Sequence, residues 1–94
     1  MEVDLDARCV RRHGRELALT NHEFNILAWL AERQGCAVDR TVLAVRVLTR
    51  GGAVSPRTVA SHVCRLREKL GGDAAAAVRT VRGVGYRFDV VEPR

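Results

Sequence analysis

The feature that most constrains this chain of 94 residues is one amphipathic segment, SPRTVASHVCRLREKL, at positions 55–70. Ser55 is a suitable N-cap, and Pro56 suits the first helical position because the N–H that it lacks would have no partner there. Gly71 and Gly72 supply a stop. Apolar residues recur at helical spacing and form one stripe: Val59, Val63, Leu66 and Leu70. The segment therefore predicts a helix that packs this stripe against a core.

The opposite face of this predicted helix is polar and basic. It carries Arg57, Thr58, Ser61, Cys64, Arg65 and Glu68, with His62 and Arg67 on its flanks. A helix of about fifteen residues is roughly 22 Å long, and the major groove of B-DNA is wide enough to admit one. The segment alone fits a DNA-reading helix and an ordinary helix with a solvated basic face equally well.

Net charge is +5, and most of the excess lies in the half that contains this helix. Residues 55–94 hold eight Lys or Arg against four Asp or Glu, a net of +4, whereas residues 1–54 hold eight Arg against seven acids, a net of +1. Such an asymmetry favours a polyanionic partner, either nucleic acid or an anionic membrane surface. The alternative is that the charge only keeps the protein soluble.

The N-terminal residues alternate as short strands at 3–5, 8–12 and 16–19, with a turn at 13–14. Links this short cannot hold a crossover, so we expect a small antiparallel sheet. Thr20-Asn21-His22-Glu23 then forms a capping box. The helix behind it should run to Arg33 or Gln34 and end at Gly35. Apolar residues lie on two of its faces, which predicts cover on both sides and makes Trp29 a core residue rather than a ligand.

A second helix is expected over about 40–48, capped by Asp39, with an apolar side formed by Val42, Leu43, Val47 and Leu48. With a short glycine-containing link it completes a helix-turn-helix-like unit with the segment at 55–70. The alanine run after Gly71 allows either a further turn or a loop. Strands at 78–81 and 86–90 then flank RGVG at 82–85, which predicts a hairpin made basic by Arg79, Arg82 and Arg87. A helix-turn-helix followed by a basic hairpin is a winged helix.

Four stretches of the chain carry a family resemblance: LTNHEFNILAWL (19–30), DRTVL (39–43), RTVASHVCRLREKL (57–70) and TVRGVGYRF (80–88). In this order and spacing they resemble the winged-helix effector domain of OmpR/PhoB-type response regulators of bacterial two-component systems. The resemblance implies an α+β fold over 1–94. Its parts would be a four-stranded N-terminal antiparallel sheet within 1–19, three helices within 20–70 and a C-terminal β-hairpin wing at 78–90.

The same resemblance implies that the third helix lies in the major groove of double-stranded DNA and that the wing meets the minor groove. By position, the family's DNA-contacting residues fall on Arg57, Thr58, Ser61, His62, Cys64, Arg65, Arg67, Thr80, Arg82 and Tyr86. The loop 49–55 corresponds to a segment that contacts RNA polymerase in some members. Further implied partners are tandem half-sites on the DNA and a receiver domain. Nothing in this sequence resembles a receiver, so the chain is either an excised effector domain or a free-standing relative.

Three positions depart from the family pattern. Cys64 stands where many members carry a basic residue, Ala60 replaces a common acidic residue, and Leu48 replaces a tryptophan. These departures affect which base sequence is read, and none of them threatens the fold.

Two other functional classes compete with DNA binding. A winged helix can serve protein contacts alone, with its basic face merely solvated. An enzyme finds little support, because Glu23 is explained by its cap, His62 is expected to face DNA or solvent, and no catalytic motif is present. The scattered cysteines and histidines predict no metal site and no cofactor, and Cys9 and Cys36 are expected to be reduced and structural. Without an apolar run of membrane-spanning length or a signal peptide, a cytoplasmic location is expected.

Overall fold

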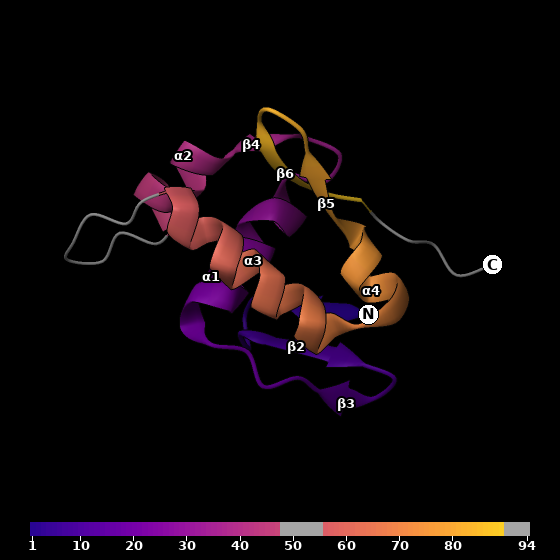
Figure 1. Ribbon diagram of the computed structural model, residues 1–94. Coiled ribbons are helices and arrows are strands. Elements are labelled where there is room, and N and C mark those ends of the chain that lie inside the picture. The colour runs from indigo at the N-terminus through magenta and orange to yellow at the C-terminus, as the bar shows by residue number, and fades with distance from the viewer. Residues whose placement is uncertain (48–55, 90–94) are drawn as a thin grey trace.

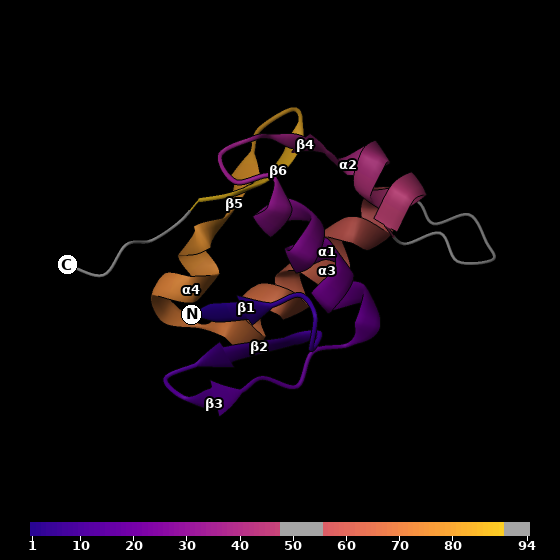
Figure 2. The same cartoon turned by 180° about the vertical axis from the view of Figure 1, so that it is seen from behind.

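The computed structural model describes residues 1–47 and 56–89. Helices form the middle of the molecule, with one three-stranded sheet at each end (Figures 1 and 2). The N-terminal sheet has the strand order β1-β2-β3, and the second sheet has the order β4-β6-β5. Apolar side chains from both sheets and from the helices between them meet in one core.

The N-terminal sheet consists of β1 (Glu2–Asp4), β2 (Cys9–Arg12) and β3 (Arg15–Glu16), all antiparallel. Its hairpin turns at His13 and Gly14, which both have positive φ, as the turn predicted at 13–14 requires. The family resemblance implied four strands in this sheet, but residues 1–19 form three, so the prediction of a fourth strand is wrong. The strand expected at 16–19 is also shorter, because the chain must turn away after Leu17 to enter the first helix.

Helix α1 (Asn21–Glu32) begins with the predicted capping box. The Thr20 hydroxyl accepts the Glu23 amide at 3.2 Å, and the Glu23 carboxylate accepts the Thr20 amide at 3.0 Å. The helix buries Phe24, Ile26, Leu27 and Leu30. Trp29 packs against the core but is only half-buried, and the Arg33 guanidinium lies 3.7 Å from its ring centroid.

The second helix departs from the prediction of a regular helix over 40–48. Asp39 does cap it, accepting the Thr41 amide at 2.6 Å, but α2 (Arg40–Val42) gives way at once to a π-helical segment, η1 (Leu43–Val47). Threonine and valine are poor helix formers because their branched side chains crowd the preceding turn, and residues 40–47 hold three valines and one threonine. Leu43 and Ala44 at the start of η1 are buried, whereas Val42 at the end of α2 is 38% exposed, so the predicted place of Val42 on the apolar side is wrong.

Helix α3 (Pro56–Leu70) is the predicted amphipathic helix, and Pro56 is its first residue. Every member of the predicted stripe is at most 1% exposed. Gly71 ends the helix at φ +66°, and the alanine run then forms a further short helix, α4 (Gly72–Ala77), which the expected three helices did not include. Ser55, Leu48 and the loop 49–55 lie outside the described residues.

The wing is built from β5 (Val78–Val81) and β6 (Gly85–Phe88), joined by a turn in which Gly83 has φ +79°. Sequence patterns predicted this hairpin but missed its third strand. Strand β4 (Val38–Asp39) pairs antiparallel with β6, with Val38 opposite Tyr86 and Asp39 opposite Gly85. The wing is therefore the outer part of a sheet whose other edge precedes α2.

Candidate nucleic-acid interface

The polar face of α3 is exposed along its length. The apolar stripe on one side of the helix is buried. On the other side, five described residues are exposed: Arg57, Thr58, Ser61, Cys64 and Arg65. Helical periodicity explains this division, because the two sets of residues lie on opposite sides of the cylinder. We call these five residues the α3 polar face.

Two polar contacts tie α3 to other elements: an ion pair with α1, and hydrogen bonds from β2 to the C-terminal end of the helix. Lys69 donates to the buried Glu23 carboxylate of α1 at 2.6 Å. Arg12 of β2 donates to the carbonyl oxygens of Leu70 and Gly71 at the C-terminal end of α3, where the helix dipole favours a cation. Burial alone would raise the pKa of Glu23, but the hydrogen bonds from Lys69 and Thr20 and the charge of Lys69 outweigh it, so that the pKa is lowered. The carboxylate is therefore ionised at neutral pH and both of its partners are satisfied.

His62 lies beside the α3 polar face and is half-buried. Its ring meets the ring of His22 from α1 edge to face, with 4.8 Å between the centroids. Desolvation, the neighbouring His22 and the charge of Arg65 together lower the pKa of His62, against a weaker opposing effect of Glu23. The Nδ1 atom of the ring is buried, so a neutral imidazole offers a ligand its other nitrogen as a single donor or acceptor, not a fixed positive charge.

Cys64 occupies the middle of the α3 polar face as an exposed free thiol. Its sulfur lies 3.8 Å from the Glu68 carboxylate, one turn further along the helix. A thiol next to a carboxylate cannot replace the phosphate contact of a basic side chain. The middle of this face is therefore less positive than the arginines on either side suggest.

The arginines of the wing differ in their environment. Asp89 accepts from Arg87 at 2.7 and 3.0 Å and lies 3.6 Å from Arg79, so two of the three predicted basic residues share one carboxylate. The hydrogen bonds from Arg87 lower the pKa of Asp89. Arg82 stands at the turn, is exposed, and makes no ion pair within the described part of the chain. It is thus the wing arginine with its charge most available to a ligand.

Arg67, Thr80 and Tyr86 were inferred separately from the resemblance, and the structure brings them together. The Arg67 guanidinium donates to the Val78 carbonyl at 2.9 Å and to the Thr80 hydroxyl at 2.8 Å, and it lies 5.6 Å from the centre of the Tyr86 ring. These three residues form the junction between α3 and the wing. Sequence spacing gave no sign of this junction, because its members come from three different elements.

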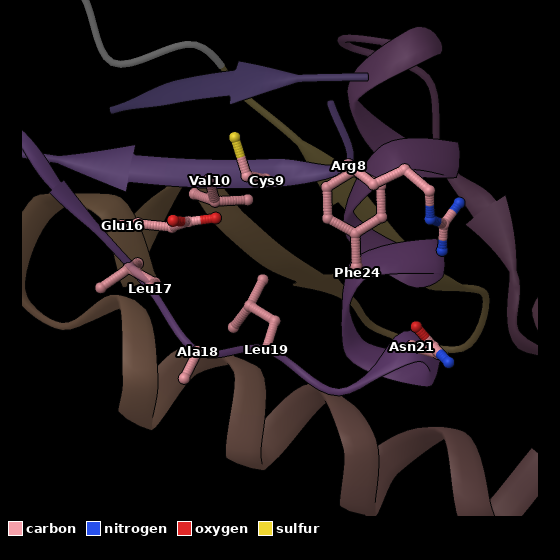
Figure 3. Close-up of a pocket in the computed structure, with 9 residues that line it drawn as sticks. All are labelled: Arg8, Cys9, Val10, Glu16, Leu17, Ala18, Leu19, Asn21 and Phe24. Atoms are coloured by element: carbon pink, nitrogen blue, oxygen red, sulfur yellow. The ribbon is translucent and has the colours of Figure 1, made fainter. Parts of the chain in front are cut away.

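A hollow of about 330 Å³ lies elsewhere, between the N-terminal sheet and the start of α1 (Figure 3). Glu16 and Phe24 are among the residues that line it, together with Leu17 and Leu19 from the segment that connects β3 to α1. No residue of α3 or the wing contributes to its wall. This hollow is therefore separate from the basic surfaces described above.

Metal-ligating side chains do not gather in groups of three or more within residues 1–47 and 56–89. The three cysteines are free; Cys9 is buried, as a structural residue should be, whereas Cys36 is exposed and the structural role expected for it is wrong. None of the helices in the described part of the chain has the length and apolar character needed to cross a membrane.

Residues 14–88 match the model of the family described as "Transcriptional regulatory protein, C terminal". The chain is 40% identical over 93 residues to the transcriptional regulatory protein SrrA of Staphylococcus aureus, an alignment that covers 96% of this chain and 39% of SrrA. The chain thus spans well under half the length of the curated relatives that it matches.

Solved structures agree with this match. The DNA-binding domain of the response regulator AdeR, in complex with an intercistronic region, is 34% identical with a TM-score of 0.77, covering 94% of this chain and 92% of that one. The response regulator DrrB, an OmpR/PhoB homologue from Thermotoga maritima, is 32% identical with a TM-score of 0.82, covering 94% of this chain and 41% of DrrB. Both likenesses extend over nearly the whole chain.

Proposed function

The chain belongs to the family of C-terminal domains of transcriptional regulatory proteins, and we propose that α3 reads the major groove of double-stranded DNA while the wing contacts the minor groove. The domain is a winged helix of the OmpR/PhoB response-regulator type that binds DNA in transcription regulation. This family consists of transcription regulators rather than enzymes. The proposal concerns which residues of this chain meet the DNA.

One observation carries the proposal: exposed arginines stand on two separate elements, α3 and the wing turn, and make no ion pair within the described residues. Arg57 and Arg65 are exposed on α3, and Arg82 is exposed at the wing turn. A guanidinium on a helix in the major groove can bind guanine O6 and N7 at once, which gives base discrimination. The minor groove offers a degenerate pattern, and its negative potential at A·T-rich steps favours arginine without naming a base.

The remaining residues take supporting roles in this proposal. Thr58, Ser61 and neutral His62 are suited to hydrogen bonds with phosphate or base edges, and Cys64 to a close apolar contact. Arg67, Thr80 and Tyr86 lie at the helix–wing junction, between the two elements that would meet the DNA. The proposed domain comprises residues 1–94, with its N-terminal sheet within 1–19, its helical core within 20–70 and its wing within 78–90.

The larger protein is also part of the proposal. Because the chain spans 39% of SrrA and 41% of DrrB, we propose that a receiver domain accompanies it in the full-length protein. One helix and one wing suffice for a half-site, so two copies would occupy tandem half-sites. The loop 49–55 is proposed to meet RNA polymerase, and the protein would act in the cytoplasm, where bacterial DNA lies.

A competition assay with arginine variants tests the division between helix and wing. Once a preferred duplex has been selected from a random pool, Arg65→Ala should cost about 1–3 kcal/mol on that duplex and relax discrimination at one or two base pairs. Arg82→Ala should weaken binding to all duplexes, most where the flank is A·T-rich, and leave the core preference intact. Arg15→Ala, which removes an exposed arginine from the N-terminal sheet, is the matched control and should change neither preference.

Two results would contradict the proposal. If the Arg65 and Arg82 variants lose affinity in parallel on every duplex, base readout by α3 and groove sensing by the wing are wrongly assigned. If the wild-type chain binds no duplex at low salt, a winged helix used for protein contacts becomes the better account. A steep decline of affinity with salt is the expected sign of phosphate contacts.

A further inference from the structure

Arg67 is the one side chain of α3 whose hydrogen bonds reach the wing within the described residues. Its Nε donates to the carbonyl oxygen of Val78 at 2.9 Å, and its Nη2 donates to the hydroxyl of Thr80 at 2.8 Å. Tyr86, whose ring lies 5.6 Å away, pairs with Thr80 across the two strands of the hairpin. A single planar guanidinium therefore contacts both strands of the wing.

The strand that Arg67 holds is the less supported of the two. Strand β6 is central in its sheet, pairs with β4 on one side, and accepts a hydrogen bond at Phe88 from the Gly35 amide at 2.9 Å. Strand β5 is at the edge and has a strand neighbour on one side only. Val78 of this strand is buried in the core, and the hydrogen bonds of Arg67 to Val78 and Thr80 tie the strand to α3 at the surface. The guanidinium thus sets how the edge of the wing lies against the helix.

We propose that Arg67 is a positioning residue, which fixes the wing relative to α3 so that major-groove and minor-groove contacts are made together. This inference rests on the proposed function, because it assigns those two contacts to α3 and the wing. A wing held in place before binding loses little conformational freedom when it meets the DNA, whereas a loosened wing must be ordered at that moment. Loss of the tie should therefore weaken the contribution of the flank, where the wing contacts the minor groove, and spare the core, which α3 reads.

The competing role for Arg67 is a direct contact with a phosphate. Arg67→Lys separates the two roles, because lysine keeps the charge but lacks the planar fork that reaches two acceptors. Thr80→Val removes one acceptor of the same junction without changing the charge or the approximate shape of the side chain. If both act through the junction, each should give the same defect, and the double variant should add little to either.

The experiment measures affinity for four duplexes: the preferred site, a core mutant, a flank mutant and a duplex with both changes. Wild type, Arg67→Lys, Thr80→Val and the double variant are compared at one salt concentration, and Arg82→Ala gives the full size of the wing contribution. Since a hydrogen bond contributes about 1 kcal/mol, the preference for the native flank should fall about threefold to tenfold in each single variant. Core preference and salt slope should stay at the wild-type values.

Arg57→Lys is the matched control, since it makes the same chemical change on the same helix at a residue far along α3 from the wing junction. Arg57→Lys should change the affinity for the flank-mutant and native-flank duplexes by the same factor, so that the flank preference stays at the wild-type value. Thermal unfolding of each variant confirms that the folded protein is being compared, and Thr80→Val alone decides the matter if Arg67→Lys does not fold.

The positioning role is overturned if the flank preference of Thr80→Val equals that of wild type, or if Arg67→Lys lowers affinity on all four duplexes by one factor. It is also overturned if the defects of the two single variants simply add. These outcomes leave the proposed function intact, because wild-type discrimination between the duplexes would persist. Failure of the wild type to distinguish the duplexes would instead overturn the proposed function itself.

Discussion

The two sheets of this molecule have the same number of strands but are assembled in different ways. In the N-terminal sheet, β1, β2 and β3 follow one another in the chain and pair with their neighbours in sequence. In the wing sheet, β4 pairs with β6, although all of the helical segment from α2 to α4 lies between them. The first is a local meander, and the second closes around the middle of the chain.

This difference separates what each sheet does for the fold. A local meander costs little loop-closure entropy, so its pairing can form early and depends on short-range sequence signals. The non-local sheet needs the helices to be in place first, and in return it fixes the base of the wing to the end of α1. The wing hairpin is thus anchored by a contact between residues distant in sequence.

The largest effect is expected from a glycine in the non-local sheet. A Cβ at Gly85 would lie 2.1 Å from the Val38 carbonyl oxygen and 2.7 Å from the Arg40 amide, both of them backbone atoms that cannot rotate away. Gly85→Ala should therefore break the β4–β6 pairing and cost more than about 2 kcal/mol of unfolding free energy. Chemical denaturation measures this loss, and DNA affinity should fall with it because the wing loses its base.

Gly14→Ala is the counterpart in the local sheet. Gly14 has φ +76° and nothing within 4 Å of an added Cβ, so the only penalty is backbone strain of about 1 kcal/mol. A Gly85 variant as stable as the Gly14 variant would show that the close approach of β4 does not constrain the wing.

Local signals predicted much of this structure. The capping box at Thr20, the stripe of α3 and the hairpin turn at Gly83 each depend on residues a few positions apart, where side-chain chemistry and backbone preference act directly. The polar face of α3 follows from the same periodicity as its stripe. These elements therefore appear in the structure close to where the sequence places them.

Other features depend on contacts that no short window contains. Strand β4 has only two residues, and its pairing with β6 becomes apparent only once the chain has folded. The short α2 leaves Val42 at the surface against the pattern, and the π-helical winding of η1 begins only after it. The pairing of Arg79 and Arg87 with Asp89, and of Arg67 with Thr80, shows that a basic residue counted from sequence can be committed within the fold. Charge alone could not separate these arginines from Arg82.

The second prediction concerns the arginine that ties the local sheet to α3. Arg12 donates to the carbonyl oxygens of Leu70 and Gly71, so Arg12→Ala removes two side-chain hydrogen bonds from the end of the helix. Hydrogen bonds from a charged donor contribute about 1.5–3 kcal/mol, which is the loss of unfolding free energy that we expect. The affinity of the folded protein for DNA, and its flank preference, should stay unchanged, in contrast to Arg67→Lys.

Arg11→Ala is the control for this variant, because neighbouring residues of a strand point to opposite faces of the sheet. It should cost clearly less stability than Arg12→Ala in the same denaturation experiment. A change of flank preference in the Arg12 variant would show that the contact of α3 with Arg12 and the contact of Arg67 with the wing are not independent. It would weaken the contrast between the two sheets.

The smallest effect is expected from the carboxylate of the wing. Asp89 engages Arg79 and Arg87, which lower its pKa, and its side chain is 30% exposed. A lowered pKa in the folded state means that the ionised carboxylate stabilises the fold above its unfolded-state pKa and that this effect is lost as the pH falls through the folded-state pKa. Asp89→Asn should therefore be slightly less stable than wild type at neutral pH and equally stable in acid.

On DNA, the same variant should act in the opposite direction. Release of the two arginines makes the wing more positive, so affinity should rise about twofold to fivefold at low salt and the salt slope should steepen by up to about one. Asp4→Asn makes the same charge change in the N-terminal sheet, where Asp4 accepts the Ala7 amide at 2.9 Å. If DNA meets the wing and not the N-terminal sheet, only the Asp89 variant should alter the slope beyond the change that net charge alone produces. Equal slopes for the two variants would mean that the DNA responds to the overall charge of the protein, and the functional contrast between the sheets would be lost.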